Sequence, residues 1–105
     1  MTVRHTRSYT LQPVADARAI RDRLRYCGGR GWAIVIEYTG DASPENHYWN
    51  RWGLPLLDPD EPELVLYEVA ACRKRYPEDY IRLLAYGADS AQSFIRDSIL
   101  VHVPK

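Results

Sequence analysis

The sequence is poor in features that mark disulfide-bonded, nucleic-acid-binding or membrane-spanning chains. It has two cysteines, Cys27 and Cys72, whose separation fits neither a CxxC motif nor a pair of metal ligands. We therefore predict two buried, reduced thiols. Basic and acidic residues number 14 each, so the net charge of zero gives no overall field toward nucleic acid or a membrane. No apolar run approaches the length of a membrane span. These absences indicate one globular domain across residues 1–105.

The residue combinations that usually form an active site are also missing. His5, His47 and His102 have no metal-ligand spacing with one another, and no serine lies in a G-x-S-x-G motif. The glycine-rich segment 28–31 precedes a predicted strand, whereas a phosphate-binding loop precedes a helix. We therefore expect no catalytic group, no metal and no cofactor in this chain.

Two amphipathic helices are predicted. Asp16 is a suitable N-cap for the first, which should run to about Cys27 and end at the glycines of segment 28–31. Its apolar stripe is Ala17, Ile20, Leu24 and Cys27. The second helix should start with Asp60 as N-cap and Glu63 as its capping-box partner, and should end before Pro77. Its predicted buried stripe consists of Val65, Leu66, Val69, Ala70, Cys72 and Tyr76.

Four strands are predicted around these helices. The apolar segment 32–38 should be a central strand, and segment 48–54 should return beside it after a polar loop. Segments 80–86 and 99–103 form the third and fourth strands, with residues 87–97 as a connection. The resulting order predicts an α+β fold in two layers, with a four-stranded antiparallel sheet and two helices on one of its faces.

The segment 47–57 is the most informative part of the chain. Tyr48, Trp49 and Trp52 stand beside Arg51, and three leucines follow within the same eleven positions. Tyrosine, tryptophan and arginine are enriched at binding hot spots, so the segment indicates a docking surface. Because the two tryptophans are three residues apart, we expect one in the core and one against a neighbouring subunit.

Two charged residues interrupt otherwise apolar strands. Glu37 and Arg82 must be paired if they are buried, and two interpretations stay open: each points to an open sheet face, or each pairs with a group on a partner. Under the second interpretation they belong to the subunit interface. The predicted interface then comprises Glu37, Tyr48, Trp49, Arg51, Trp52, Leu54, Pro55 and Arg82.

Four blocks of the sequence carry a family resemblance. They are GWAIVIEYT at 31–39, YWNRWGLPL at 48–56, EVAACRK at 68–74 and YIR at 80–82. In this order and spacing they resemble the small subunit of form I ribulose-1,5-bisphosphate carboxylase/oxygenase. Their sequences are most similar to those of the proteobacterial and red-type branch. Members of that branch usually carry a C-terminal hairpin extension, whereas this sequence stops at Lys105, so the branch stays open.

The resemblance implies a non-catalytic subunit in a complex of eight large and eight small subunits. The small subunits cap the large-subunit octamer and modulate turnover and CO2/O2 specificity, while Mg2+ and a carbamylated lysine belong to the large subunit. The implied partners are the large subunit and neighbouring small subunits. We expect the loop 39–47 and the basic first helix to face neighbouring small subunits or the axial opening, and not a substrate. No transit peptide precedes Met1, so we expect the bacterial cytoplasm, with packaging in a carboxysome left open.

Three other interpretations are weaker. A small-subunit-like adaptor module that binds the carboxylase in a condensate or carboxysome is the first alternative. Such modules usually occur as repeats joined by linkers, and this sequence has one unit without linkers. A ligand-binding regulatory domain of ferredoxin-like type would need a glycine-rich loop between a strand and a helix, which is missing. An independent enzyme ranks last, because no base and nucleophile pair is present.

Overall fold

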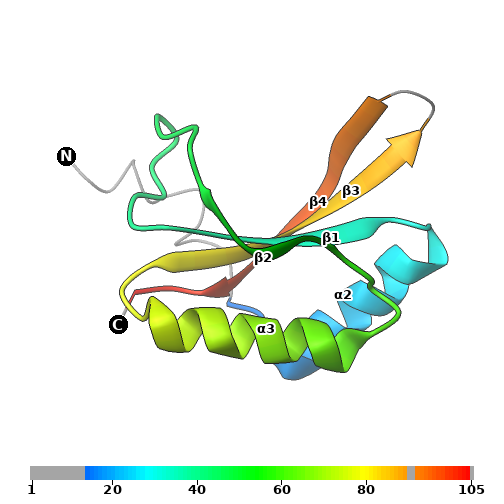
Figure 1. The fold of residues 1–105 in the computed structure, drawn as a ribbon, viewed down its shortest axis with the longest axis horizontal. Helices are drawn as coiled ribbons and strands as arrows, with labels where there is room; N and C mark the ends of the chain where they lie inside the picture. The colour runs from blue at the N-terminus through cyan, green and yellow to red at the C-terminus, as the bar shows by residue number, and fades with distance from the viewer. Residues whose placement is uncertain (1–13, 90–91, 105) are drawn as a thin grey trace.

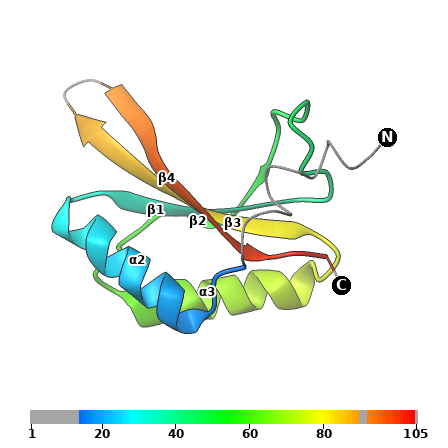
Figure 2. The same ribbon diagram turned by 180° about the vertical axis from the view of Figure 1, so that it is seen from behind.

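The fold is the predicted two-layer α+β arrangement. The computed structural model describes residues 14–89 and 92–104. Its elements are α2 (Ala17–Gly29), β1 (Ala33–Thr39), β2 (Asn50–Leu57), α3 (Pro62–Arg75), β3 (Tyr80–Asp89) and β4 (Gln92–His102). The four strands form one antiparallel sheet in the order β2-β1-β3-β4, so β1 is central as expected. Both helices lie on the same face of this sheet (Figures 1 and 2). We call this the helix face and the opposite side the second face.

The first helix begins and ends for the reasons that the sequence suggests. The Asp16 carboxylate accepts a hydrogen bond from the Ala19 amide at 2.9 Å, which confirms Asp16 as the N-cap. At the other end, the amides of Trp32 and Gly31 donate to the carbonyls of Cys27 and Gly28, and Gly31 has φ 73°. This is a Schellman motif, which needs a left-handed residue after the helix. α2 runs two residues further than predicted, and Ala17 is exposed, unlike the rest of the predicted stripe.

The capping box predicted for α3 is wrong. Glu61, not Asp60, is the N-cap, and no side chain caps the helix. The Asp58 carboxylate accepts a hydrogen bond from the Asp60 amide at 2.8 Å, and this tight turn holds Asp60 before the helix. Glu63 does not cap the helix and instead forms an ion pair with Arg21 of α2 at 2.8 Å. The buried stripe is otherwise confirmed, except that Ala70 is exposed.

The second strand lies two residues later than predicted. Residues 46–49 form part of the loop, because the Asn46 side chain accepts from the Tyr48 amide and donates to the Asp41 carbonyl. Within β2, Gly53 has φ 68°, and the register against β1 shifts between Ile34 and Ile36. A left-handed glycine at a bulge lengthens and bends a strand in ways that an alternating pattern does not reveal.

Residues 87–97 do not form the irregular connection that the sequence predicted. β3 and β4 continue as a hairpin whose pairs include Gly87 with Phe94 and Asp89 with Gln92. The hairpin extends beyond the helices (Figures 1 and 2). Gly87 is part of the reason why residues 87–97 were not predicted as strands, since glycine weakens a strand prediction. Here it makes room: a Cβ at Gly87 would lie 2.7 Å from Arg96 Nε and 3.0 Å from Trp32 Nε1.

Apolar side chains fill both faces of the sheet. On the helix face, Ile34 and Ile36 pack with Cys27 and Cys72 in the main core, and both thiols are free and buried, as predicted. The second face is also closed to solvent in its centre, where Val35, Leu84 and Leu100 are at most 2% exposed. Glu37 and Arg82 therefore sit among buried apolar neighbours rather than on an open sheet surface.

Candidate subunit interface

A row of charged residues crosses the second face. In the strand register Arg51 lies opposite Glu37, and Glu37 lies opposite Arg82. Glu37 Oε1 accepts hydrogen bonds from Arg82 Nη2 at 2.8 Å and from Arg82 Nε at 3.1 Å. Both side chains are largely buried, with 11% and 17% of their surfaces exposed. The pairing thus explains how the chain accommodates both charges without a partner.

The indole of Trp49 packs over this buried pair. The guanidinium carbon of Arg82 lies 3.8 Å from the centroid of the Trp49 ring, which is a cation–π contact. Trp49 precedes β2 in the chain and so covers the row from the loop side. Glu37, Arg82 and Trp49 form a fixed base on the second face. Neither open interpretation of the sequence foresaw that the two charges would pair with each other beneath an indole.

Trp52 lies on the other side of the sheet. It is half-buried against the main core, and its Nε1 donates to Glu68 Oε1 of α3 at 2.9 Å. Its ring meets Tyr38 and Tyr76 edge-on, with centroid distances of 6.3 and 6.2 Å. Trp49 and Trp52 therefore lie on opposite faces, as their spacing predicts, and Trp52 is the one that joins the core.

Tyr38 and Tyr76 stack in the same cluster with ring centroids 4.2 Å apart. The hydrogen bond with Tyr76 and, secondarily, burial raise the pKa of Tyr38 to about 12. Sequence analysis missed this cluster, although Tyr38 occupies the helix-facing position after Ile34 and Ile36 in β1. Tyr76 follows the last turn of α3, so only the tertiary fold brings the three rings together.

Tyr48 and Arg51 remain exposed beside the fixed base. Tyr48 is 70% exposed, and Arg51 is exposed too, although it faces Glu37 in the strand register. Within residues 14–89 and 92–104, Arg51 makes no ion pair, because Glu37 is engaged by Arg82. The backbone of Leu54 and Pro55 belongs to β2, but their side chains lie outside the described part of the structure. Among the predicted interface residues whose side chains the structure describes, Tyr48 and Arg51 are the exposed ones.

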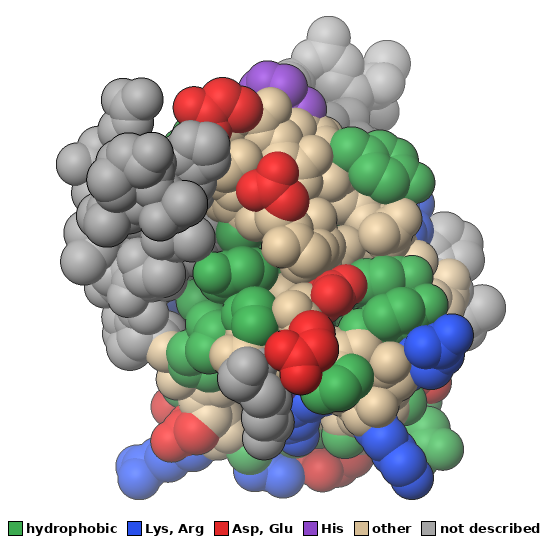
Figure 3. Space-filling view, turned by 90° about the vertical axis from the view of Figure 1, so that its left-hand side faces the viewer, with side chains coloured by type: hydrophobic (Ala, Val, Ile, Leu, Met, Phe, Trp, Pro, Cys, Tyr) green, Lys and Arg blue, Asp and Glu red, His purple; other side chains and the backbone are tan. Residues whose placement is uncertain are grey.

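Hydrogen bonds fix the loop that presents Tyr48. Thr39 Oγ1 accepts from the Asp41 amide at 3.2 Å and from Asn46 Nδ2 at 3.1 Å, and Asp41 Oδ1 accepts from the Ser43 amide at 3.0 Å. Figure 3 views the end of the molecule that carries this loop. Acidic and hydrophobic side chains alternate across it, and basic side chains gather along the lower edge, near the end of α3. A loop held in this way presents its side chains with little loss of entropy on binding.

The described residues show neither a metal-ligand cluster nor a thiol with a lowered pKa. Among residues 14–89 and 92–104, no three His, Cys, Asp or Glu side chains are grouped as metal ligands. Burial raises the pKa of the Cys72 thiol to about 12 and raises that of Cys27 as well, so both thiols are protonated at neutral pH and are poor nucleophiles. No helix in this part of the chain is long and apolar enough to span a membrane.

Comparison with known proteins decides the family. The family model described as ribulose bisphosphate carboxylase, small chain, matches residues 5–104. The chain belongs to this family. It is 40% identical over 85 residues to a ribulose bisphosphate carboxylase small subunit from Cyanidioschyzon merolae, covering 81% of this chain and 62% of that protein. It is 39% identical over 97 residues to one from Sinorhizobium medicae, covering 92% and 75%.

The fold of the family is confirmed by a solved structure, the Rubisco from Galdieria partita. The match has a TM-score of 0.79 and 35% sequence identity, and it covers 93% of this chain and 71% of that chain. The similar small subunits come from algae as well as bacteria, so the similarity itself does not favour a bacterial source. The resemblance inferred from the four sequence blocks is confirmed at the level of the family.

Proposed function

We propose that this chain is a non-catalytic small subunit of ribulose-1,5-bisphosphate carboxylase/oxygenase. In this role it caps and stabilises an octamer of large subunits, within a complex of eight large and eight small subunits. It also modulates the turnover of carboxylation and the discrimination between CO2 and O2. The reaction itself, a carbon–carbon lyase chemistry run in the carboxylating direction, belongs to the large subunit.

The single observation that carries this proposal is the family match across residues 5–104. The geometry of the second face supports it. Arg51 and Tyr48 are exposed next to a buried base of Glu37, Arg82 and Trp49 that keeps the neighbouring backbone in place. An arginine and a tyrosine held on a rigid support are the side chains that most often dominate binding energy.

The chain acts without supplying a catalytic group. Binding at the second face would favour the arrangement of large-subunit loops that closes the distant site. Such an effect is a coupling free energy between two sites, typically about 1–3 kcal/mol. Mg2+ and a carbamylated lysine are proposed for the large subunit, and the chemistry they supply there is activation of the substrate for carboxylation. We place the complex in the bacterial cytoplasm, with or without a carboxysome.

The proposal is tested by co-expressing this chain with its large subunit and measuring native mass and carboxylation. We expect a complex with equal numbers of the two chains, and a higher turnover than that of the large-subunit core alone. The isolated small chain should show no carboxylation. Equal rates with and without this chain, together with no co-migration on native gels, would refute the assignment.

A further inference from the structure

A groove lies on the helix face, away from the candidate interface residues on the second face. It is a hollow of about 330 Å3 between α2 and the β3–β4 hairpin, lined by Arg23, Tyr26, Trp32, Arg96 and Asp97. A second hollow, of about 460 Å3, continues from Arg23 along α2 and β4 toward Val14. The two hollows share Arg23, and both are open to solvent.

A β-bulge creates the groove. Ala85 pairs with Asp97 and Tyr86 pairs with Ile95, so Arg96 is the extra residue in β4. A bulge places two successive side chains on one side of a strand. Arg96 and Asp97 accordingly both line the hollow beneath the hairpin. Because Gly87 has no side chain, Arg96 and Trp32 can approach the strand closely there.

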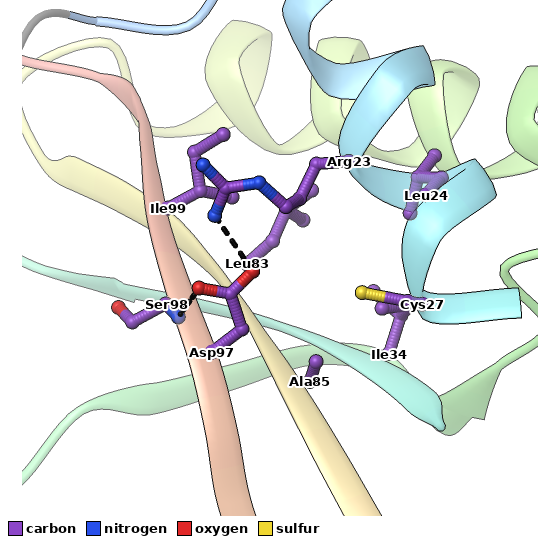
Figure 4. A pocket seen from close by; sticks show the side chains of 9 residues that line it. All are labelled: Arg23, Leu24, Cys27, Ile34, Leu83, Ala85, Asp97, Ser98 and Ile99. Atoms are coloured by element: carbon purple, nitrogen blue, oxygen red, sulfur yellow. Dashed lines mark hydrogen bonds and ion pairs between the residues drawn. The ribbon is translucent and has the colours of Figure 1, made fainter. Parts of the chain in front are cut away.

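The acidic group in the groove is already neutralised. Arg23 Nη1 of α2 donates to Asp97 Oδ2 of β4 at 2.6 Å, and the Ser98 amide donates to Asp97 Oδ1 at 2.9 Å (Figure 4). Beneath this ion pair, Leu24 and Cys27 close a core cavity of only about 10 Å3. The ion pair therefore joins α2 to the hairpin and leaves no uncompensated negative charge at the floor of the groove.

Arg30 contacts the two aromatic side chains of the groove, Tyr26 and Trp32, but is not itself one of the residues that line the hollow. Tyr26 is 50% exposed and meets Trp32 edge-on, with ring centroids 5.7 Å apart. The guanidinium of Arg30 lies 4.6 Å from the Tyr26 ring centroid and 5.8 Å from that of Trp32. No carboxylate within residues 14–89 and 92–104 forms an ion pair with Arg30.

Within residues 14–89 and 92–104, three arginines of α2 differ from Arg30, whereas Arg18 resembles it in forming no ion pair. Arg21, Arg23 and Arg25 each form an ion pair, with Glu63, Asp97 and Asp22 respectively. Capping of the helix does not account for Arg30, because backbone amides already satisfy the carbonyls of Cys27 and Gly28. A guanidinium that lies flat on an aromatic ring keeps its N–H edge available for a carboxylate, which it can bind through two hydrogen bonds.

We propose that the groove between α2 and the β3–β4 hairpin docks an acidic, aromatic-containing segment of a partner protein. A carboxylate of the segment pairs with Arg30, and an adjacent apolar or aromatic side chain packs on Tyr26 and Trp32. Charge complementarity argues against the chain's own residues 1–13, which contain arginines and no aspartate or glutamate. This surface is distinct from the second-face residues Tyr48 and Arg51 that are proposed to meet the large subunit, and a contact of α2 with a neighbouring small subunit would compete with the segment for it.

The experiment measures binding of a fluorescein-labelled peptide, GDEFDEFDG, to the full-length chain by fluorescence anisotropy at low salt. We expect saturable binding that weakens as salt is added. The variant Arg30→Glu should lose about tenfold or more in affinity, which is about 1.4 kcal/mol or more. Arg25→Glu is the matched control, because Arg25 is an exposed arginine of the same helix, and its affinity should change less than threefold. Tyr26→Ala should weaken binding, whereas Tyr26→Phe keeps the ring and should not.

Specific outcomes would overturn the proposal. Equal losses for Arg30→Glu and Arg25→Glu would mean attraction to the basic helix as a whole. Equal binding of GDESDESDG, in which serine replaces phenylalanine, would remove the aromatic contact. Displacement by millimolar inorganic phosphate would indicate a small-anion site. If Arg30→Glu abolishes self-association of the chain in sedimentation, the occupant is a second copy. The exposed position of Arg30 favours a folded variant, and circular dichroism checks this, with Arg30→Gln as the milder substitution.

Discussion

The two faces of the sheet are closed by different chemistry. On the helix face, apolar side chains, two thiols and the ring cluster of Tyr38, Trp52 and Tyr76 bury neutral groups. On the second face, Glu37 and Arg82 are buried as a charge pair beneath Trp49. Burying a pair of charges contributes little net stability compared with apolar packing, but it fixes geometry. Apolar packing is common to both faces, since Val35, Leu84 and Leu100 are buried on the second one. The charge pair is what distinguishes the second face, and it holds the strand next to Arg51 and Tyr48.

The largest expected effect comes from breaking the charge pair on one side only. Glu37→Ala removes the carboxylate that pairs with the buried Arg82 guanidinium and should destabilise the chain by roughly 3 kcal/mol or more. The double variant Glu37→Leu with Arg82→Met removes both charges and should recover most of that loss. Urea unfolding of the three proteins measures both quantities. A double variant as unstable as the single one would show that the pair supplies stability rather than geometry.

The next effect concerns binding rather than folding. Arg51→Ala or Tyr48→Ala should weaken association with the large subunit by about 2 kcal/mol, roughly 30-fold, since each is a candidate hot spot. Arg25→Ala and Tyr67→Ala are matched controls, because Tyr67 is 69% exposed and Arg25 is exposed on α2. Native mass spectrometry against a titrated large-subunit core gives the affinities. Equal losses for variants and controls would place the binding surface elsewhere.

A smaller effect is expected from the polar contact that joins β2 to α3. Trp52→Phe keeps an aromatic ring in the cluster but removes the Nε1 hydrogen bond to Glu68. The free energy of unfolding should fall by about 1–2 kcal/mol, part of it from the smaller ring. Association with the large subunit should be unchanged, because Trp52 lies on the helix face. Weakened assembly in a folded Trp52→Phe variant would contradict the assignment of the two tryptophans to opposite faces.

The last effect is absent at neutral pH and is a dependence on alkaline pH that arises on the helix face. Burial raises the pKa of Cys72 from 9.0 to about 12, so between these values the unfolded chain has lost a proton that the folded chain keeps. Stability from this group is therefore fully present below pH 9 and is lost as the pH rises toward about 12. Cys72→Ala should be less stable at neutral pH but should lose less stability between pH 9 and 11. Parallel losses in both proteins would assign the alkaline dependence to other groups.

Local patterns predicted the parts of the fold that depend on local physics. Asp16 caps α2 because its carboxylate reaches an amide three residues ahead. The predicted placement of Trp49 and Trp52 on opposite faces is also confirmed, but Trp49 lies in the loop before β2, where strand alternation does not apply. The errors arose where distant residues compete for a side chain. Glu63 fits a capping box by spacing, but Arg21, 42 residues away in sequence, takes its carboxylate.

The candidate site was predictable in composition but not in pairing. Aromatic residues and arginine in segment 47–57 indicated a binding surface, and Glu37 and Arg82 were recognised as charges that need partners. Their mutual pairing depends on the antiparallel register of β1 and β3, which brings together residues 45 positions apart. The extended hairpin was not predicted for a similar reason. Glycine is needed at position 87 because Trp32 and Arg96 lie against it, and this contact forms only in the folded chain.

The irregular edge strand β2 has a consequence for how copies of this chain can associate. Within the described ranges 14–89 and 92–104, β2 borders the sheet with β1 as its single neighbour, so its outer backbone groups could accept a strand from another molecule. The left-handed Gly53, the register shift opposite it and the missing N–H of Pro55 interrupt that hydrogen-bonding row. Strand-to-strand addition along this edge is therefore disfavoured, which protects against fibrous aggregation while the chain is at high concentration in a cell. Specific contacts on this side must be made by side chains.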